Sequence, residues 1–189
     1  MFNGNVGISA NAGSTISDCT SVYNGGGISV GTGGTIRGCS ARLNSSDGIS
    51  ASQATVVDCT VQANQLRGIV VSQGSTVNRC TARVNSQHGI QVSSSCTVSD
   101  NTCELNGNSD VGAGIRVFGS QNRIDGNHVI NNDYGIYISA TNNLVIRNSA
   151  SGNGTNFFFI GAQVFGPTNN LVGTGGTITN QSPWANFAF

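Results

Sequence analysis

The sequence predicts an all-β fold, a single-stranded right-handed parallel β-helix (a solenoid) of about eight coils with roughly 21 residues each. The first observation behind this prediction is a Gly-Ile pair that recurs at steps of 20, 21, 20, 21, 25 and 21 residues. The glycines of these pairs are Gly7, Gly27, Gly48, Gly68, Gly89, Gly114 and Gly135. A period of this length, built from short alternating segments, is typical of β-helix coils.

The second observation is a set of anchors in fixed register with the Gly-Ile pairs. One row, meaning the equivalent position in successive coils, contains Cys19, Cys39, Cys59, Cys80, Asn101, Asn127 and Asn148. Five residues after each of these comes an asparagine, in the row Asn24, Asn44, Asn64, Asn85, Asn106, Asn132 and Asn153. Three residues before each comes an aliphatic residue, in the row Ile16, Ile36, Val56, Val77, Val98, Ile124 and Val145.

Each coil is expected to contain three short strands joined by three corners. The "GIxV" segments, such as "GISV" and "GIYI", alternate between inward and outward positions, and the "TV" or "TI" segments do the same. In the third segment we expect Leu43, Val84 and Leu105 to point inward. A right-handed winding follows because crossover connections between parallel strands are almost always right-handed.

Stacking of the coils at a spacing of about 4.8 Å predicts ladders of like side chains. Asparagine tolerates left-handed backbone, so the asparagines are expected at a corner, with amides hydrogen-bonded from coil to coil. The cysteines are expected to form a buried ladder of free thiols, while Cys96 and Cys103 lie outside their register. The glycine before each isoleucine is expected at the third corner, where a positive φ or tight packing is needed.

The repeat register suggests one domain, with β-helix coils over residues 1–160. Residues 161–189 are expected to add a last partial coil and an aromatic cap, since they contain Phe165, Trp184, Phe187 and Phe189. At the other end Met1-Phe2 falls in the middle of a strand. We therefore expect either further coils before it or self-association that covers that end.

Composition argues against several classes of partner. Charged residues make up 8%, no lysine occurs, and eight arginines balance eight acidic residues. Such a neutral chain is not expected to bind nucleic acid through electrostatics. No apolar run approaches the roughly 20 residues of a membrane helix, so no membrane insertion is expected.

The stretch "NNDYGIYISATNNLVIRNSASGNG", residues 131–154, resembles the right-handed parallel β-helix repeat of the pectin-lyase-like superfamily. The tail "TITNQSPWANFAF" is similar to the C-termini of bacterial β-helix repeat proteins of unassigned function. The resemblance implies a secreted or cell-envelope location and a polysaccharide as partner. It also covers polysaccharide lyases and hydrolases, so it indicates the fold more directly than the activity.

The dispersal of the acidic residues argues against catalysis and against a metal site. The row before the cysteines reads Asp18, Gly38, Asp58, Arg79, Asp100, Gly126 and Arg147, with no two acids on adjacent coils. A shared calcium ion is therefore not expected there, and Asp58, Arg79 and Asp100 are interpreted as an exposed ionic ladder. The hydrolase motifs NTD and G-H-G are missing, and no cofactor, metal or catalytic residue is assigned.

The candidate site lies on the later coils, beside the one sizeable insertion, "GNSDVGA" at residues 107–113. The candidate ligand-binding residues are Arg67, His88, Asp110, Arg116, Tyr134 and Tyr137. Aromatic rings with arginines suit a sugar or an acidic glycan, although a solvated face with scattered polar residues is the simpler interpretation. The favoured function is a non-catalytic scaffold or glycan-binding module. The alternative is a polysaccharide-active enzyme that uses Arg67, His88, Arg116 and Tyr137.

Overall fold

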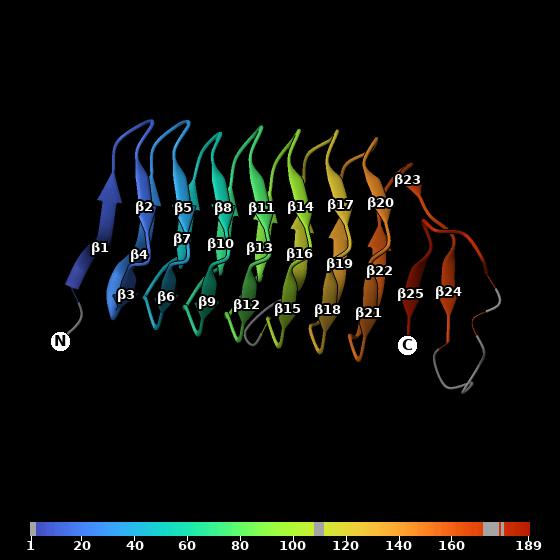
Figure 1. The fold of residues 1–189 in the computed structure, drawn as a ribbon. Coiled ribbons are helices and arrows are strands. Elements are labelled where there is room, and N and C mark those ends of the chain that lie inside the picture. The colour runs from blue at the N-terminus through green and yellow to red at the C-terminus, as the bar shows by residue number, and fades with distance from the viewer. Residues whose placement is uncertain (1–2, 108–111, 172–177, 179) are drawn as a thin grey trace.

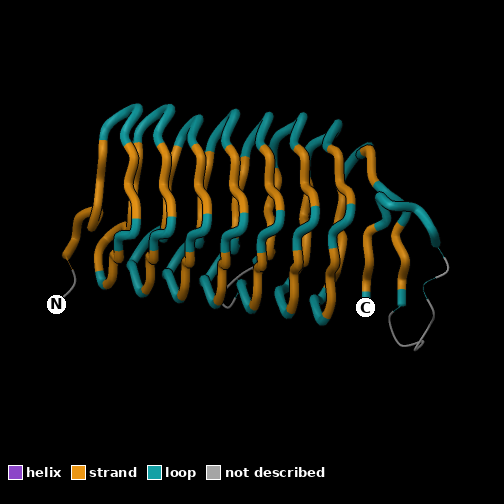
Figure 2. Tube along the Cα trace, in the orientation of Figure 1, coloured by secondary structure: helices purple, strands orange, loops and turns teal. Residues whose placement is uncertain are grey.

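The computed structural model describes residues 3–107, 112–171, 178 and 180–189, and these residues form a parallel β-solenoid (Figure 1). Strands and turns alternate along the whole stack, and the described residues contain no helix (Figure 2). None of them therefore forms a helix long and apolar enough to cross a membrane. The predicted all-β class, the parallel pairing and the number of coils are confirmed.

Three parallel sheets run along the solenoid, and each coil contributes one strand to each sheet. The first sheet contains β1 (Asn3–Ala10), β4 (Asn24–Val30), β7 (Ile49–Ala51), β10 (Ile69–Val71), β13 (Ile90–Val92), β16 (Ala113–Val117), β19 (Tyr134–Ile138) and β22 (Thr155–Phe159). The second contains β2 (Thr15–Ser17), β5 (Thr35–Arg37), β8 (Thr55–Val57), β11 (Thr76–Asn78), β14 (Thr97–Ser99), β17 (Arg123–Asp125), β20 (Leu144–Ile146) and β23 (Val164–Phe165).

The third sheet departs from chain order at its far end. It contains β3 (Thr20–Val22), β6 (Ser40–Arg42), β9 (Thr60–Gln62), β12 (Thr81–Arg83), β15 (Thr102–Glu104), β18 (His128–Ile130), β21 (Ser149–Ser151), β25 (Asn186–Ala188) and β24 (Thr168–Asn170). The chain thus forms β24 first and then returns to place β25 between β21 and β24. Asn186 continues the row of Asn148, and Ala188 pairs with Ala150.

The core is the stack of inward rows that the repeat predicts. Ile49, Ile69 and Ile90 pair directly across neighbouring strands of the first sheet and are completely buried. The aliphatic row of the second sheet is equally buried from Ile36 to Val145. Burying such side chains stabilises a fold by about 1.5–3 kcal/mol each, so these rows supply most of the driving force for coiling.

The corners differ from the prediction in one respect. The ladder asparagines from Asn24 to Asn153 do not adopt left-handed backbone; the residue before each one does, as at Leu43, Val84 and Leu105, with φ between 55° and 56°. These three side chains are therefore turned away from the core, and the prediction that they point inward is wrong. The inward positions belong instead to the middle residues of the third-sheet strands, such as Ala82 and Cys103.

The glycine before each isoleucine is required by close packing and not by a positive φ. A Cβ atom on Gly48 would lie 2.6 Å from Nδ2 of Asn64 and 2.8 Å from the carbonyl oxygen of Gly68. This glycine row lets the asparagine ladder and the first sheet approach each other. Of the two expected reasons for the glycine, tight packing is the one that the structure shows.

The asparagine ladder satisfies buried backbone groups at its corner. The side-chain oxygen of Asn64 accepts hydrogen bonds from the backbone N–H and the side-chain amide of Asn44, at 3.1 and 2.9 Å. Its own amide donates to the carbonyl of Ala41 at 3.1 Å and to the side chain of Asn85 at 3.0 Å. Because every amide is both donor and acceptor, one side chain per coil serves two coils.

All six cysteines are free thiols, and only Cys19, at the first complete corner, is not fully buried. The predicted cysteine stack is confirmed, since the Cys19 N–H points to Sγ of Cys39 at 3.4 Å. Residues 1–2 lie outside the described residues, so the expected mid-strand start at Met1-Phe2 remains a prediction, as do the further coils or self-association at that end.

Candidate functional site

The outward face of the first sheet changes character along the solenoid. Strands β16, β19 and β22 have five residues each, whereas β7, β10 and β13 have three. The register of the longer strands places Arg116, Tyr137 and Phe158 in one outward row. Tyr134 lies in a neighbouring row, three residues before Tyr137. We call these four side chains the aromatic surface.

The rings of the aromatic surface contact one another. The ring centroids of Tyr134 and Tyr137 are 5.2 Å apart, and those of Phe158 lie 5.3 Å from Tyr134 and 5.0 Å from Tyr137. Phe158, which is 36% exposed, was not among the predicted site residues, although it follows Tyr137 by one repeat of 21 residues. Contacts of this kind fix ring orientations on a surface that solvent reaches.

Arg116 covers one edge of this cluster. Its guanidinium lies 3.8 Å from the centroid of the Tyr137 ring, within the range of a cation–π interaction. The same group donates to the carbonyl of Val117 at 3.1 Å and to Oγ of Ser139 at 3.0 Å. Burial lowers the pKa of Arg116 from its usual value, but an arginine remains charged at neutral pH. The surface therefore presents a fixed cation beside two partly buried tyrosine rings and the exposed ring of Phe158.

His88 lies before β13, one coil away from Arg116. Its Nδ1 accepts a hydrogen bond from the backbone N–H of Ala113 at 3.1 Å, which requires the neutral ring. Burial, followed by the charges of Arg116 and Arg67, lowers the pKa of His88 to about 4. The ring is thus neutral at physiological pH and holds the strand after the insertion, which indicates a structural role.

Arg67 is one coil further away and is paired with Asp47. Its Nε and Nη2 bind the two carboxylate oxygens of Asp47 at 2.8 and 2.9 Å. This bidentate geometry occupies the Nε–Nη2 edge of the guanidinium. Of the predicted site residues, the structure brings Arg116, Tyr134 and Tyr137 together and places His88 and Arg67 progressively further along the row; Asp110 lies outside the described residues.

Two further acidic residues, Asp58 and Asp100, lie in the row just before the cysteines. Arg79 binds Asp58 through two hydrogen bonds of 2.7 and 2.9 Å, while Asp100 accepts from the Asn78 amide at 3.1 Å. The expected ionic ladder therefore reduces to one exposed ion pair and an adjacent hydrogen bond. Within the described ranges, no three histidine, cysteine or acidic side chains converge in a way that could hold a metal ion.

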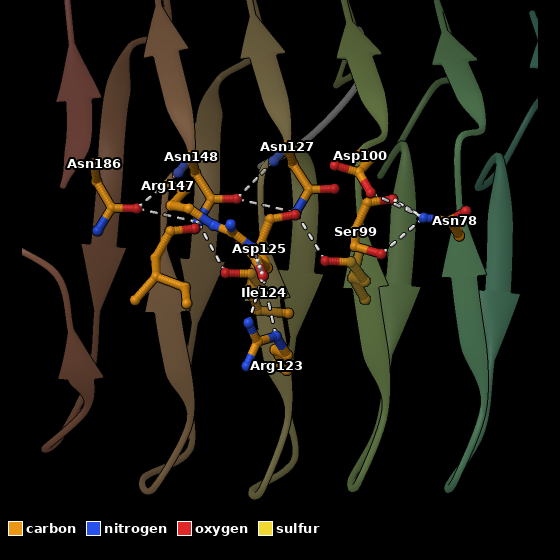
Figure 3. Close-up of polar contacts among 12 residues, drawn as sticks. Asn78, Ser99, Asp100, Arg123, Ile124, Asp125, Asn127, Arg147, Asn148 and Asn186 are labelled. Carbon is orange, nitrogen blue, oxygen red and sulfur yellow. Dashed lines mark hydrogen bonds and ion pairs between the residues drawn. The ribbon is translucent and has the colours of Figure 1, made fainter. Parts of the chain in front are cut away.

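A buried carboxylate that the sequence analysis did not single out lies on β17 (Figure 3). Asp125 is 4% exposed and is bound by Arg123 from its own strand and by Arg147 from the next coil. Burial would raise the pKa of Asp125, but the hydrogen bonds from Arg147 and Arg123 outweigh burial and hold the pKa below its usual value. A single aspartate in an otherwise mixed row carries no sequence signal for such a cluster.

Two comparisons with known proteins bear on this chain. A family model described as a right-handed β-helix region matches residues 2–106, which is more than half of the sequence. A search of curated protein sequences gives no match.

Proposed function

Because this chain belongs to the right-handed β-helix family, we propose that it is a non-catalytic scaffold whose later coils bind a glycan. The ligand-binding region in this proposal is the aromatic surface of β16, β19 and β22. The first coils serve as a rigid support for it. A secreted or envelope setting suits this role, because extracellular glycans would be the available ligands.

The observation that carries the proposal is the contiguous cluster of Arg116, Tyr134, Tyr137 and Phe158. Partly exposed rings held by one another offer flat apolar area to the apolar faces of sugar rings at little cost in side-chain entropy. The adjacent guanidinium supplies donors for hydroxyl or carboxylate groups. Regular strands hold these side chains, so little conformational freedom is lost on binding.

The chemistry near this surface favours binding over turnover. A general base needs an accessible nitrogen or carboxylate, and the Nδ1 atom of His88 is already occupied by the Ala113 N–H. The alternative, a polysaccharide-active enzyme that uses Arg67, His88, Arg116 and Tyr137, would have to release Arg67 from Asp47 and His88 from Ala113. Both rearrangements would break hydrogen bonds that the fold uses.

The proposal is tested by incubating the protein with acidic and neutral polysaccharides, with and without calcium. Binding is measured together with the release of new unsaturated or reducing ends. We expect binding to at least one polysaccharide without product. Tyr137→Ala should weaken binding by about tenfold or more, the loss of roughly one aromatic contact of 1.4 kcal/mol.

Tyr23→Ala provides the matched control, since Tyr23 is an exposed tyrosine at a corner of an early coil. It should bind as the unmodified protein does. Product release that disappears in His88→Ala, with the fold intact, would establish the enzyme instead. The absence of binding to any polysaccharide would leave only the scaffold role.

A further inference from the structure

A pocket lies at the far end of the second sheet, on a side of the solenoid that the aromatic surface does not occupy. Its volume is about 380 Å³, within the range of pockets that hold small ligands. Its lining includes Arg123, Leu144, Ile146, Val164, Phe165 and Trp184. It thus combines apolar walls with one cationic side chain.

The segment that returns to form β25 builds one wall of this pocket. The carbonyl oxygen of Trp184 accepts the backbone N–H of Arg147 at 3.3 Å, which ties the segment to the coil below. A Cβ atom on Gly166 would lie 1.7 Å from that oxygen, so the close approach requires glycine. Phe165 also lines the pocket, and its ring contacts the Phe159 ring at a centroid distance of 5.8 Å. The Trp184 backbone is therefore held in place, and the Phe165 ring has a neighbour that orients it, before any ligand arrives.

The cationic side is equally pre-organised. Arg123 donates from Nε and Nη2 to Oδ2 of Asp125 at 3.0 and 2.7 Å, and Arg147 donates to both oxygens of the same carboxylate (Figure 3). The Arg147 guanidinium also lies 5.7 Å from the centroid of the Trp184 ring. Two guanidinium groups share one buried carboxylate, so this cluster has a net positive charge. Asp100, in the row of Arg147, accepts from the Asn78 amide. The hydrogen bond to Asp125 raises the pKa of Arg147, and the charge of Asp100 also helps to raise it.

We propose that this pocket binds a small organic anion in which a carboxylate is attached to an apolar ring. The ring packs against Trp184 and the aliphatic walls, and the carboxylate pairs with Arg123. The aliphatic walls from Leu144, Ile146 and Val164 favour an aromatic or alicyclic ring over a sugar, because sugar hydroxyls would lose water there without replacement hydrogen bonds. The proposal is independent of glycan binding, since it concerns another sheet and other residues.

Trp184 is the only tryptophan in the chain, so its fluorescence reports directly on this pocket. The probes are cyclohexanecarboxylate, its neutral carboxamide, benzoate and glucuronate, each titrated into the full chain. We expect a saturable fluorescence change with the two ring acids. The carboxamide should bind at least about tenfold more weakly, because it cannot form a charge-assisted pair with a guanidinium. Glucuronate should bind more weakly than cyclohexanecarboxylate.

Two variants locate the site. Arg123→Gln should weaken cyclohexanecarboxylate binding by about tenfold or more, and Val164→Asp should abolish it by adding a negative charge at a residue that is 67% exposed. Arg79→Gln is the matched control, because Arg79 lies in the row of Arg147 and binds Asp58 in the same manner, several coils away. Its affinity should be unchanged.

Four results would overturn the proposal. They are no saturable change with either ring acid, equal affinity for the carboxamide, equal weakening by Arg79→Gln, and tighter binding of glucuronate than of cyclohexanecarboxylate. The Val164→Asp result stands even where Arg123→Gln disturbs the Asp125 cluster, because that variant leaves the cluster intact.

Discussion

The early and the later coils fill the same corner of the β-helix with different side chains. At the corner before the third sheet, the first four coils place a cysteine, and from Asn101 onward the coils place an asparagine. In the cysteine part the backbone N–H of Cys19 points to the sulfur of the next coil at 3.4 Å. In the asparagine part the N–H of Asn127 donates to the amide oxygen of Asn148 at 2.9 Å.

The comparison shows what the corner requires: a small inward side chain that accepts from the coil before it and donates to a nearby carbonyl. The thiol of Cys59 points to the carbonyl of Val57 at 3.2 Å, and the amide of Asn127 donates to the carbonyl of Asp125 at the same distance. Asparagine adds an amide-to-amide bond that a thiol cannot make. The later coils should therefore depend more strongly on this corner.

A second corner repeats the change. Cys96, which the repeat left out of register, stands in a row with Asn122 and Asn143, directly before the strands of the second sheet. Its N–H donates to Oδ1 of Asn122 at 2.8 Å, the same distance as that from Cys80 to Asn101. The change from cysteine to asparagine therefore occurs at two corners, at one between Cys80 and Asn101 and at the other between Cys96 and Asn122.

The largest expected effect is that of Asn127→Ala. The side chain is 1% exposed, and its loss leaves the N–H and the amide of Asn101 without their acceptor and the carbonyl of Val98 without its donor. We expect the free energy of unfolding to fall by about 3 kcal/mol, measured by chemical denaturation. His128→Ala, at the exposed neighbouring position, should change it by less than about 0.5 kcal/mol. Equal effects of the two variants would contradict the ladder account.

Cys59→Ala should cost less, about 1–2 kcal/mol, because sulfur forms weaker hydrogen bonds and only a small void results. The same denaturation experiment measures this change. A cost equal to that of Asn127→Ala would show that the two chemistries are equivalent at this corner and would remove the distinction between early and later coils.

Acid should weaken the fold through His88, at the boundary between the two parts. Its pKa of about 4 in the folded protein lies below that of an unfolded histidine, about 6.5, so the stability it contributes is present above pH 6.5 and is lost as the pH falls toward 4. Because the ring is only partly buried, we expect about 1 kcal/mol between pH 7 and pH 5. His88→Gln should reduce this pH dependence of the free energy of unfolding, measured by chemical denaturation at several pH values. An unchanged pH dependence would mean that other groups cause it.

The smallest effect concerns thiol reactivity in the folded state. Burial raises the pKa of Cys39, Cys96 and Cys103, which disfavours the reactive thiolate. Only Cys19 is partly exposed, so one of the six thiols should be alkylated quickly and five slowly. Mass spectrometry after brief labelling counts them, and rapid labelling of all six would contradict the buried stack.

Most of the fold could be predicted because the repeat fixes one register for every inward row. The Ile49, Ile69 and Ile90 pairing and the cysteine stack both follow from spacing alone. The orientation of Leu43 could not, since the left-handed backbone that turns it outward occurs on a residue type that rarely adopts it. The return of β25 was missed because it breaks chain order, although "NFA" at residues 186–188 matches "NSA" at 148–150.

The repeat register also allowed part of the candidate site to be predicted. The register places Arg116, Tyr137 and Phe158 in one row, but it says nothing of how deeply each is buried. The pairing of Arg67 with Asp47 and of His88 with Ala113 depends on side-chain rotamers, which a repeat pattern does not encode.

The central claim is that the early coils are a support and that the ligand binds on the later ones. Hydrogen–deuterium exchange with and without a bound polysaccharide tests this division directly. The account predicts slower amide exchange in β16, β19 and β22 on binding, and unchanged exchange in β4, β7 and β10. Protection centred on the early coils, or binding that leaves the strands of the aromatic surface unchanged, would contradict it.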